Sequence, residues 1–167
     1  GVINQDSDAY VKTLDEWIEI PGSAKAIADL YKAGYQIAVA TNQSGIARNY
    51  FTEETLASMH KKMSGLVEEQ GGHFATIKYC PHGPDDHCDC RKPLAGLVTQ
   101  IEDELKLSAQ GAYLVGDSLR DLQAGVAKGC KPVLVLTGKG EKTQSKTLPE
   151  GTEIFDNLEG FVNSILN

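Results

Sequence analysis

The amino-acid sequence predicts an α/β fold, a Rossmann-like parallel sheet with helices on both faces. Two observations predict it. Short apolar runs of four or five residues alternate along the chain with longer segments in which apolar residues recur at helical spacing. Most of these runs end in polar or glycine-rich residues, and such positions are where parallel α/β sheets bind ligands.

The composition limits the classes of protein to which the chain can belong. Its 167 residues suit a single domain over residues 1–167. A formal net charge of −7 argues against nucleic-acid binding, which needs a basic face. No apolar run approaches the roughly 20 residues that span a bilayer, and no secretion signal is visible. We therefore expect a cytoplasmic monomer that acts on a small molecule.

The first half of the chain predicts two helix–strand units. A helix follows Pro21-Gly22, with Ser23 as its cap and Gly34 at its end. A buried strand over residues 37–40 then stops at a polar loop. A second helix opens at residue 52 with acidic residues in its first turn, and a strand over residues 75–79 follows it.

The second half continues the alternation. Pro93 suits the first turn of a helix that runs to about residue 105. A strand over residues 112–115, a helix that Gly129 closes and a strand over residues 132–136 come next. Residues 138–151 predict a mobile loop, and a last helix covers about residues 158–166.

A cluster of cysteine and histidine separates the two halves and predicts a structural zinc site. Three thiolates and one imidazole fill a tetrahedron and leave no open position. The predicted ligands are Cys80, His82, Cys88 and Cys90. His87 is an alternative to His82, although it adjoins Cys88 and would strain the chelate. Reduced thiols that merely cluster are the other interpretation, and Cys130 is expected to be an ordinary buried thiol.

Polar residues at the predicted strand ends suggest a phosphate site. Arg91 and Lys92 could hold phosphate oxygens, or they could be a solvated basic pair. Asp117 suits a Mg²⁺ ligand, and Asp121, one helical turn later, could orient the site or simply favour a helix start. The remaining predicted phosphate contacts are Thr41, Asn42, Gln43, Ser44 and Arg48, which could instead form an ordinary turn.

Taken in order, these residues resemble the haloacid dehalogenase superfamily of phosphatases. Thr41 matches its second motif, Lys92 its third, and Gly116-Asp117 with Asp121 its fourth. The cysteine loop is similar to two branches, the D-glycero-D-manno-heptose-1,7-bisphosphate 7-phosphatases and the histidinol-phosphate phosphatases. The stretch from Thr41 to Arg48 resembles the heptose branch, whereas the histidinol branch carries an Asp in place of Ser44.

The resemblance implies a mechanism. An Asp attacks phosphorus to form an aspartyl-phosphate, and a second Asp protonates the leaving oxygen and then activates water. Mg²⁺ bound by Asp117, together with Thr41 and Lys92, offsets the charge on the phosphoryl group. Asp6, Tyr10 and Arg91 correspond to substrate-contacting residues. The pathway implied is the synthesis of nucleotide-activated heptose for lipopolysaccharide.

The two catalytic aspartates of the superfamily have no counterpart in the sequence. Gly1 matches the glycine that follows them, so we expect the Asp-x-Asp motif and the central first strand to lie upstream of residue 1. Asp6-Ser7-Asp8 has the same spacing, but too few apolar residues precede it for a buried strand. Residues 1–167 alone are expected to be inactive. The alternative from another class is a non-catalytic fragment that binds zinc and sugar phosphates.

Overall fold

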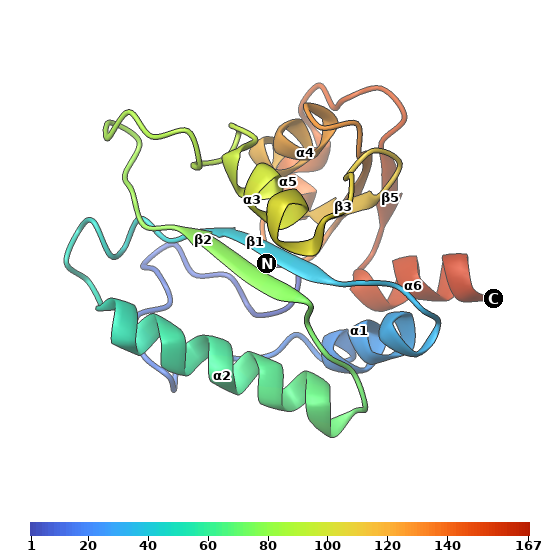
Figure 1. The fold of residues 1–167 in the computed structure, drawn as a ribbon, viewed down its shortest axis with the longest axis horizontal. Coiled ribbons are helices and arrows are strands. Elements are labelled where there is room, and N and C mark those ends of the chain that lie inside the picture. Colours follow the sequence, from blue (N-terminus) through green and yellow to red (C-terminus); the bar gives the residue numbers. More distant parts are fainter.

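Strands and helices alternate along the chain (Figure 1). The computed structural model describes all residues, 1–167. The strands are β1 (Ala38–Asn42), β2 (Thr76–Cys80), β3 (Tyr113–Gly116), β4 (Lys131–Val135) and β5 (Glu153–Phe155). The helices are α1 (Ser23–Lys32), α2 (Glu53–Glu69), α3 (Gly96–Leu105), α4 (Leu119–Val126), α5 (Gly140–Gln144) and α6 (Leu158–Leu166). None of the helices combines the length and the apolar character needed to cross a membrane.

All strand pairs are parallel, as predicted, but they form two sheets and not one. β1 pairs with β2, and β3, β4 and β5 form the other sheet in that order. No strand among residues 1–167 pairs with both β1 and β3, so the facing edges of the two sheets are not bonded to each other. The α/β class is therefore confirmed, and the sheet is interrupted between β1 and β3.

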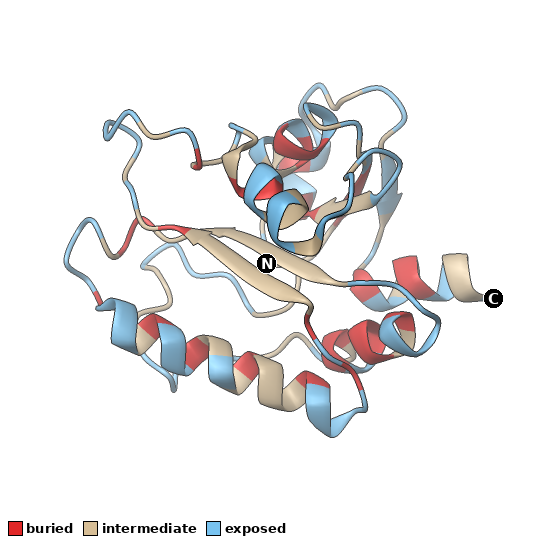
Figure 2. Cartoon of the chain, viewed as in Figure 1, coloured by how far each residue is buried: buried red, intermediate tan, exposed pale blue.

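Helices cover the strands from two sides. α1 and α2 lie on one side of β1 and β2, and α3 and α4 lie on the other (Figure 1). The buried residues of α2 recur every three or four positions, at Leu56, Met59, Met63 and Val67, so one stripe of the helix faces the core (Figure 2). This packing fixes the strands and thereby the loops at their carboxyl ends.

The structure corrects two predicted helix starts. The N-cap of α1 is Gly22, and the Ser23 hydroxyl donates a hydrogen bond to the Val2 carbonyl at 3.2 Å. α3 begins at Gly96 and not at Pro93. The reason is that the backbone of the preceding Lys92 is hydrogen-bonded to the side chain of Asn42, which keeps this segment at the end of β1.

The predicted loop over residues 138–151 is wrong in part. The first half of this segment contains α5, and β5 begins two residues after the end of the segment. The Thr143 hydroxyl is buried in α5 and donates to the Asp117 carbonyl at 2.8 Å. The short helix was not predicted because the segment is polar and has no apolar periodicity. It packs against the loop after β3.

Candidate active site

A large cavity lies at the carboxyl ends of β1 and β3 and extends between the two strands. Its volume is about 990 Å³. All but one of the residues that the sequence predicted to touch phosphate, substrate or Mg²⁺ line it, together with the predicted positioning carboxylate; the exception is Arg48. The residues that line it are Asp6, Tyr10, Thr41, Asn42, Gln43, Ser44, Arg91, Lys92, Asp117 and Asp121. The structure thus brings together side chains that are more than 100 positions apart in the chain.

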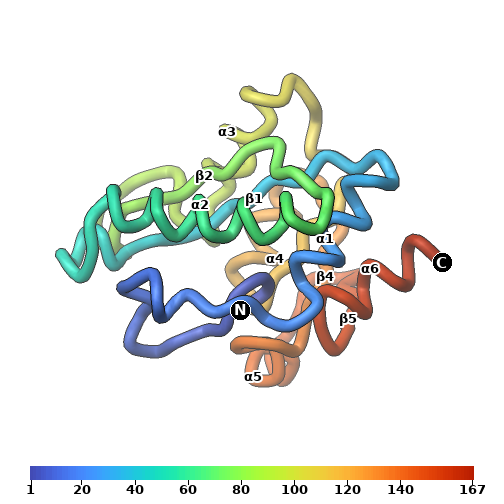
Figure 3. The backbone as a smooth tube through the Cα atoms, turned by 90° about the horizontal axis from the view of Figure 1, so that it is seen from below, coloured from blue at the N-terminus to red at the C-terminus, as the bar shows by residue number.

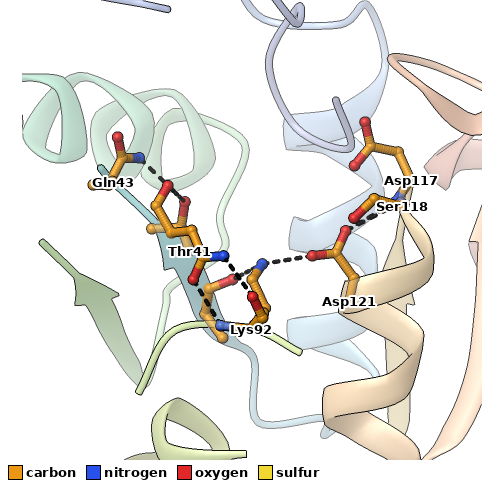
Figure 4. A network of polar contacts seen from close by, with 8 residues as sticks. Thr41, Gln43, Lys92, Asp117, Ser118 and Asp121 are labelled. Carbon is orange, nitrogen blue, oxygen red and sulfur yellow. Dashed lines mark hydrogen bonds and ion pairs between the residues drawn. The ribbon is translucent and has the colours of Figure 1, made fainter. Parts of the chain in front are cut away.

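The end of β1 presents Thr41 to this cavity (Figure 4). The Gln43 side-chain amide donates to the Thr41 hydroxyl oxygen at 3.1 Å, and the hydroxyl itself donates to the Asn42 carbonyl at 3.5 Å, a long contact that a better acceptor could replace. Ser44, the next polar residue of the loop, is buried. Thr41 is therefore held in place by its own loop, and the strand end can offer a donor to a phosphate oxygen.

Asn42 has a role that the sequence did not reveal. Its side-chain amide donates to the Lys92 carbonyl at 3.2 Å, and its side-chain oxygen accepts from the Lys92 backbone N–H at 3.0 Å. Both ends of the amide are thus engaged by one residue. Asn42 fastens Lys92 to β1, and we expected it to contact substrate instead.

The Lys92 ammonium reaches from the end of β1 to Asp121 (Figure 4). Its Nζ lies 2.7 Å from Asp121 Oδ1 and also donates to the Ala40 carbonyl at 2.9 Å. Only 12% of the Lys92 side chain and 13% of the Asp121 side chain are exposed. Burial acts to raise the pKa of Asp121, but the Lys92 ammonium and hydrogen bonds from Ser118 outweigh it, so the pKa lies below its ordinary value.

Asp117 follows β3 and is held from three sides. Its backbone N–H donates to Asp121 Oδ2 at 3.3 Å, and its carbonyl accepts from the Thr143 hydroxyl. Its carboxylate Oδ2 accepts from the Lys139 backbone N–H at 3.0 Å. The other carboxylate oxygen has no hydrogen bond within the protein. An oriented carboxylate at the edge of this cavity fits the oxygen ligands that Mg²⁺ prefers.

Residues after β4 complete the site, and the sequence reasoning missed them. The Thr137 hydroxyl donates to the Gly1 carbonyl at 2.6 Å, and the Lys139 ammonium lies 3.9 Å from Asp6 Oδ2. Lys139 fell within the predicted mobile loop over residues 138–151, and Thr137 immediately precedes that loop. Thr137-Gly138-Lys139-Gly140 follows an apolar strand directly, and that position at a strand end was the signal that could have identified them.

Tyr10 is fixed by an aromatic contact and a cation. Its ring meets the Tyr50 ring edge-on with centroids 5.1 Å apart, and the Arg48 guanidinium lies 5.8 Å from its centroid. Its backbone has a φ of +68°, in the left-handed region that non-glycine residues seldom adopt. The N-terminal loop therefore carries an ordered aromatic side chain at the cavity.

Three of the four predicted zinc ligands come together outside this cavity. The sulfurs of Cys80, Cys88 and Cys90 all lie within 4.8 Å of one another. The His82 ring is not part of this group, and its backbone carbonyl accepts from Arg91 Nη1 at 3.3 Å. Burial and the two neighbouring thiols raise the pKa of Cys90 to about 12. A divalent cation such as Zn²⁺ would favour the thiolates, so the donor set fits that metal.

The arrangement can bind and polarise a phosphate group. A hydroxyl, a buried ammonium and an oriented carboxylate face one cavity, and the Arg91 side chain lines it as well. The only Asp-x-Asp pair in the chain, Asp6 and Asp8, is exposed in the N-terminal loop, and Asp6 faces Lys139. The cavity thus gathers a hydroxyl, an ammonium and carboxylates of the kinds that can stabilise a phosphoryl group.

Comparisons of the sequence with known proteins relate it to one family of phosphatases. Residues 89–161 match a family model described as HAD-hydrolase-like. Two relatives named D-glycero-beta-D-manno-heptose-1,7-bisphosphate 7-phosphatase resemble the chain over 99% of its length. The protein of Pseudomonas putida is 55% identical and 95% covered, and that of Pseudomonas aeruginosa is 56% identical and 93% covered.

A solved structure shares the fold over nearly the whole chain. The D,D-heptose 1,7-bisphosphate phosphatase from Bordetella bronchiseptica, crystallised with magnesium and phosphate, superimposes with a TM-score of 0.96. It is 49% identical in sequence, and the match covers 99% of this chain and 93% of that one. Sequence identity and structural similarity therefore both relate the chain to proteins named heptose-1,7-bisphosphate phosphatases.

Proposed function

The chain belongs to the D-glycero-D-manno-heptose-1,7-bisphosphate 7-phosphatase family of haloacid-dehalogenase-like hydrolases, and we propose that its site hydrolyses the 7-phosphate of that sugar bisphosphate. The observation that carries the proposal is the meeting of Thr41, Lys92 and Asp117 at one cavity. These are the groups that a phosphoryl transfer needs for positioning and charge stabilisation. The reaction is the hydrolysis of a phosphoric monoester.

Four side chains at the cavity have distinct tasks in this proposal. Thr41 donates its hydroxyl hydrogen to a phosphoryl oxygen, and Lys92 offsets the negative charge that develops there. Asp121 holds the Lys92 ammonium in place through their 2.7 Å contact. Asp117 would ligate Mg²⁺, which supplies Lewis-acid stabilisation of the phosphoryl oxygens when bound.

The sugar would be bound by the loops around the cavity. The proposed substrate contacts are Asp6, Tyr10, Asn42, Gln43, Ser44 and Arg91, in addition to Thr41 and Lys92. Asn42 would act mainly through the backbone of Lys92, because its amide is already used there. Arg91 lines the cavity from the cysteine loop, and its half-buried position suits recognition of the distal part of the substrate.

The nucleophile is assigned to a strand ahead of Gly1. The gap between β1 and β3 supports this, since both strands have an unpaired edge and apolar residues such as Val39, Val115 and Phe161 line the cavity between them. Gly1 lines the same cavity and lies next to the Asp117 carboxylate. A parallel strand ending in Asp-x-Asp would deliver both carboxylates beside Asp117. Residues 1–167 alone would then be inactive.

The cysteine group is assigned to structural zinc. Cys80, Cys88 and Cys90 are already within 4.8 Å of one another, and His82 would complete the set by turning its ring toward them. The loop from Cys80 to Cys90 has few apolar residues with which to hold its shape. A metal there would order the loop and, through it, Arg91 and Lys92.

The proposed setting is heptose metabolism in the cytoplasm. The product would feed nucleotide-activated heptose for lipopolysaccharide, and the protein would act as a monomeric single domain, residues 1–167, without nucleic-acid or membrane partners. The net charge of −7 argues against a polyanionic partner. It is compatible with a small-molecule substrate that a few local cations hold.

Phosphate release tests the proposed function. The protein carrying the additional strand should release phosphate from D-glycero-D-manno-heptose 1,7-bisphosphate with Mg²⁺ present. Phosphorus NMR of the product should show that the 1-phosphate remains. Turnover of histidinol phosphate in preference to the heptose would contradict the assignment, and so would loss of the 1-phosphate.

A further inference from the structure

Lys139 joins the N-terminal loop to the carboxylate at the end of β3. Its backbone N–H donates to Asp117 Oδ2 at 3.0 Å, and its ammonium lies 3.9 Å from Asp6 Oδ2. The first contact is a hydrogen bond, which fixes where the Lys139 backbone sits. The second is an ion pair longer than a hydrogen bond, so it attracts Asp6 without fixing one geometry.

Neighbouring contacts stabilise this junction. The segment from Thr137 to Thr143 touches Gly1 through the Thr137 hydroxyl and Asp117 through the Thr143 hydroxyl. α5 and the N-terminal segment lie side by side in Figure 3, which agrees with these contacts. Lys139 is thus anchored by its backbone, and its side chain is free to act on the loop that carries Asp6.

We propose that Lys139 is a positioning residue for substrate binding, which holds Asp6 at the cavity beside the proposed metal ligand. The inference rests on the proposed function, in which Asp6 contacts the sugar. The Asp6 side chain is 33% exposed and the Lys139 side chain 43% exposed. Without the ammonium, the exposed N-terminal loop has no other ionic contact to hold this carboxylate.

The expected effect is on binding and not on the chemical step. An ion pair this exposed contributes little to the free energy of substrate binding. We expect its loss to change the affinity for substrate by about threefold to fivefold. In the strand-extended protein, Lys139→Met should raise KM by about that factor and leave kcat within about twofold. Lys139→Arg should restore KM, because the charge returns. Lys142→Met is the matched control, since it removes an exposed lysine of α5, three positions along the chain, that has no ion pair.

A double substitution separates coupling from independent effects. Asp6→Asn should raise KM to a similar degree, and Asp6→Asn with Lys139→Met should raise it no further. Multiplied effects in the double variant would overturn the proposal, as would an unchanged KM in Lys139→Met. If the unmodified extended protein shows no turnover, the proposed function fails and not this inference.

A second measurement does not need turnover. Amide hydrogen exchange of residues 4–12 in the present chain should be faster in Lys139→Met than in Lys142→Met, because the loop loses its tie to α5. Equal exchange in the two variants would overturn the proposal whatever the enzyme assay shows.

Discussion

The contact between Lys92 and Asp121 orients the ammonium that we propose acts on the phosphoryl group. Both side chains are largely buried, and their charges are 2.7 Å apart. A buried charge without a partner is costly, so each residue stabilises the other. The ammonium is therefore already oriented before substrate arrives, and little reorganisation is needed when charge develops on the phosphoryl group.

Removing Lys92 should affect both stability and turnover. Lys92→Met leaves Asp121 as an uncompensated buried carboxylate, which should lower the free energy of unfolding by about 3 kcal/mol. Turnover of the extended protein should fall at least about 100-fold, since the developing charge is no longer offset. Urea unfolding and phosphate release measure the two effects.

The double variant is the control for that prediction. Lys92→Met with Asp121→Asn should regain most of the lost stability, because no buried charge remains, and should stay as inactive as Lys92→Met. Recovery of turnover along with stability would show that Lys92 supports the fold and has no part in the reaction.

The cysteine cluster makes a separate prediction at the residue scale. Cys88→Ser should abolish the binding of one zinc ion per chain, because it removes one of three sulfurs that lie within 4.8 Å of one another. Plasma mass spectrometry of the purified protein measures the metal. Cys130→Ser, which alters a thiol outside the cluster, should keep its zinc, and equal zinc in both variants would contradict the site.

At the scale of elements, apolar periodicity predicted most of the structure. Four strands and the helices with long apolar stripes, such as α2, lie close to their predicted positions. α5 and β5 were missed because five and three residues carry too little pattern to detect. The start of α3 was wrong because it depends on bonds between Lys92 and Asn42, which are 50 positions apart in the chain.

The site shows the same contrast between features that a local pattern predicts and features that depend on contacts between distant segments. The residues lining the cavity could be predicted, since carboxyl ends of parallel strands converge on one edge of the fold. Their partners could not. Asn42 holds a backbone, Lys139 reaches back to Asp6, and the ring of His82 lies outside the sulfur group. These details depend on side-chain packing between distant segments, which no local pattern specifies.

α2 should make stability depend on pH through His60. This residue is partly buried on the helix beside Tyr79, and burial lowers the pKa of its imidazole below the ordinary value of 6.5. The unfolded chain therefore binds a proton more readily than the folded one, and stability should fall as the pH drops below about 6.5.

Urea unfolding at pH 7.5 and 5.5 measures this effect. His60→Gln should lose less stability between the two values than the unmodified chain, because Gln does not titrate. His73→Gln, at an exposed position, is the matched control and should behave like the unmodified chain. An identical pH dependence in His60→Gln would show that burial of His60 has no role in it.

At the scale of the whole molecule, the interruption between β1 and β3 has the greatest consequence. Two parallel sheets face each other across a cavity of about 990 Å³, and all the proposed catalytic groups are at one end of it. Unpaired strand edges lined by apolar side chains favour pairing with another strand. The unpaired edges and the apolar lining are the features on which the proposed additional strand rests.

The most direct test of the account compares phosphate release from heptose 1,7-bisphosphate by three proteins. They are residues 1–167, the same chain preceded by an apolar strand ending in Asp-x-Asp, and that extension with its first Asp changed to Asn. We predict release by the Asp-x-Asp protein alone, because only it has a nucleophile beside Asp117. Release by residues 1–167, or equal release by the Asp and Asn extensions, would contradict the account and would place the nucleophile elsewhere in the chain.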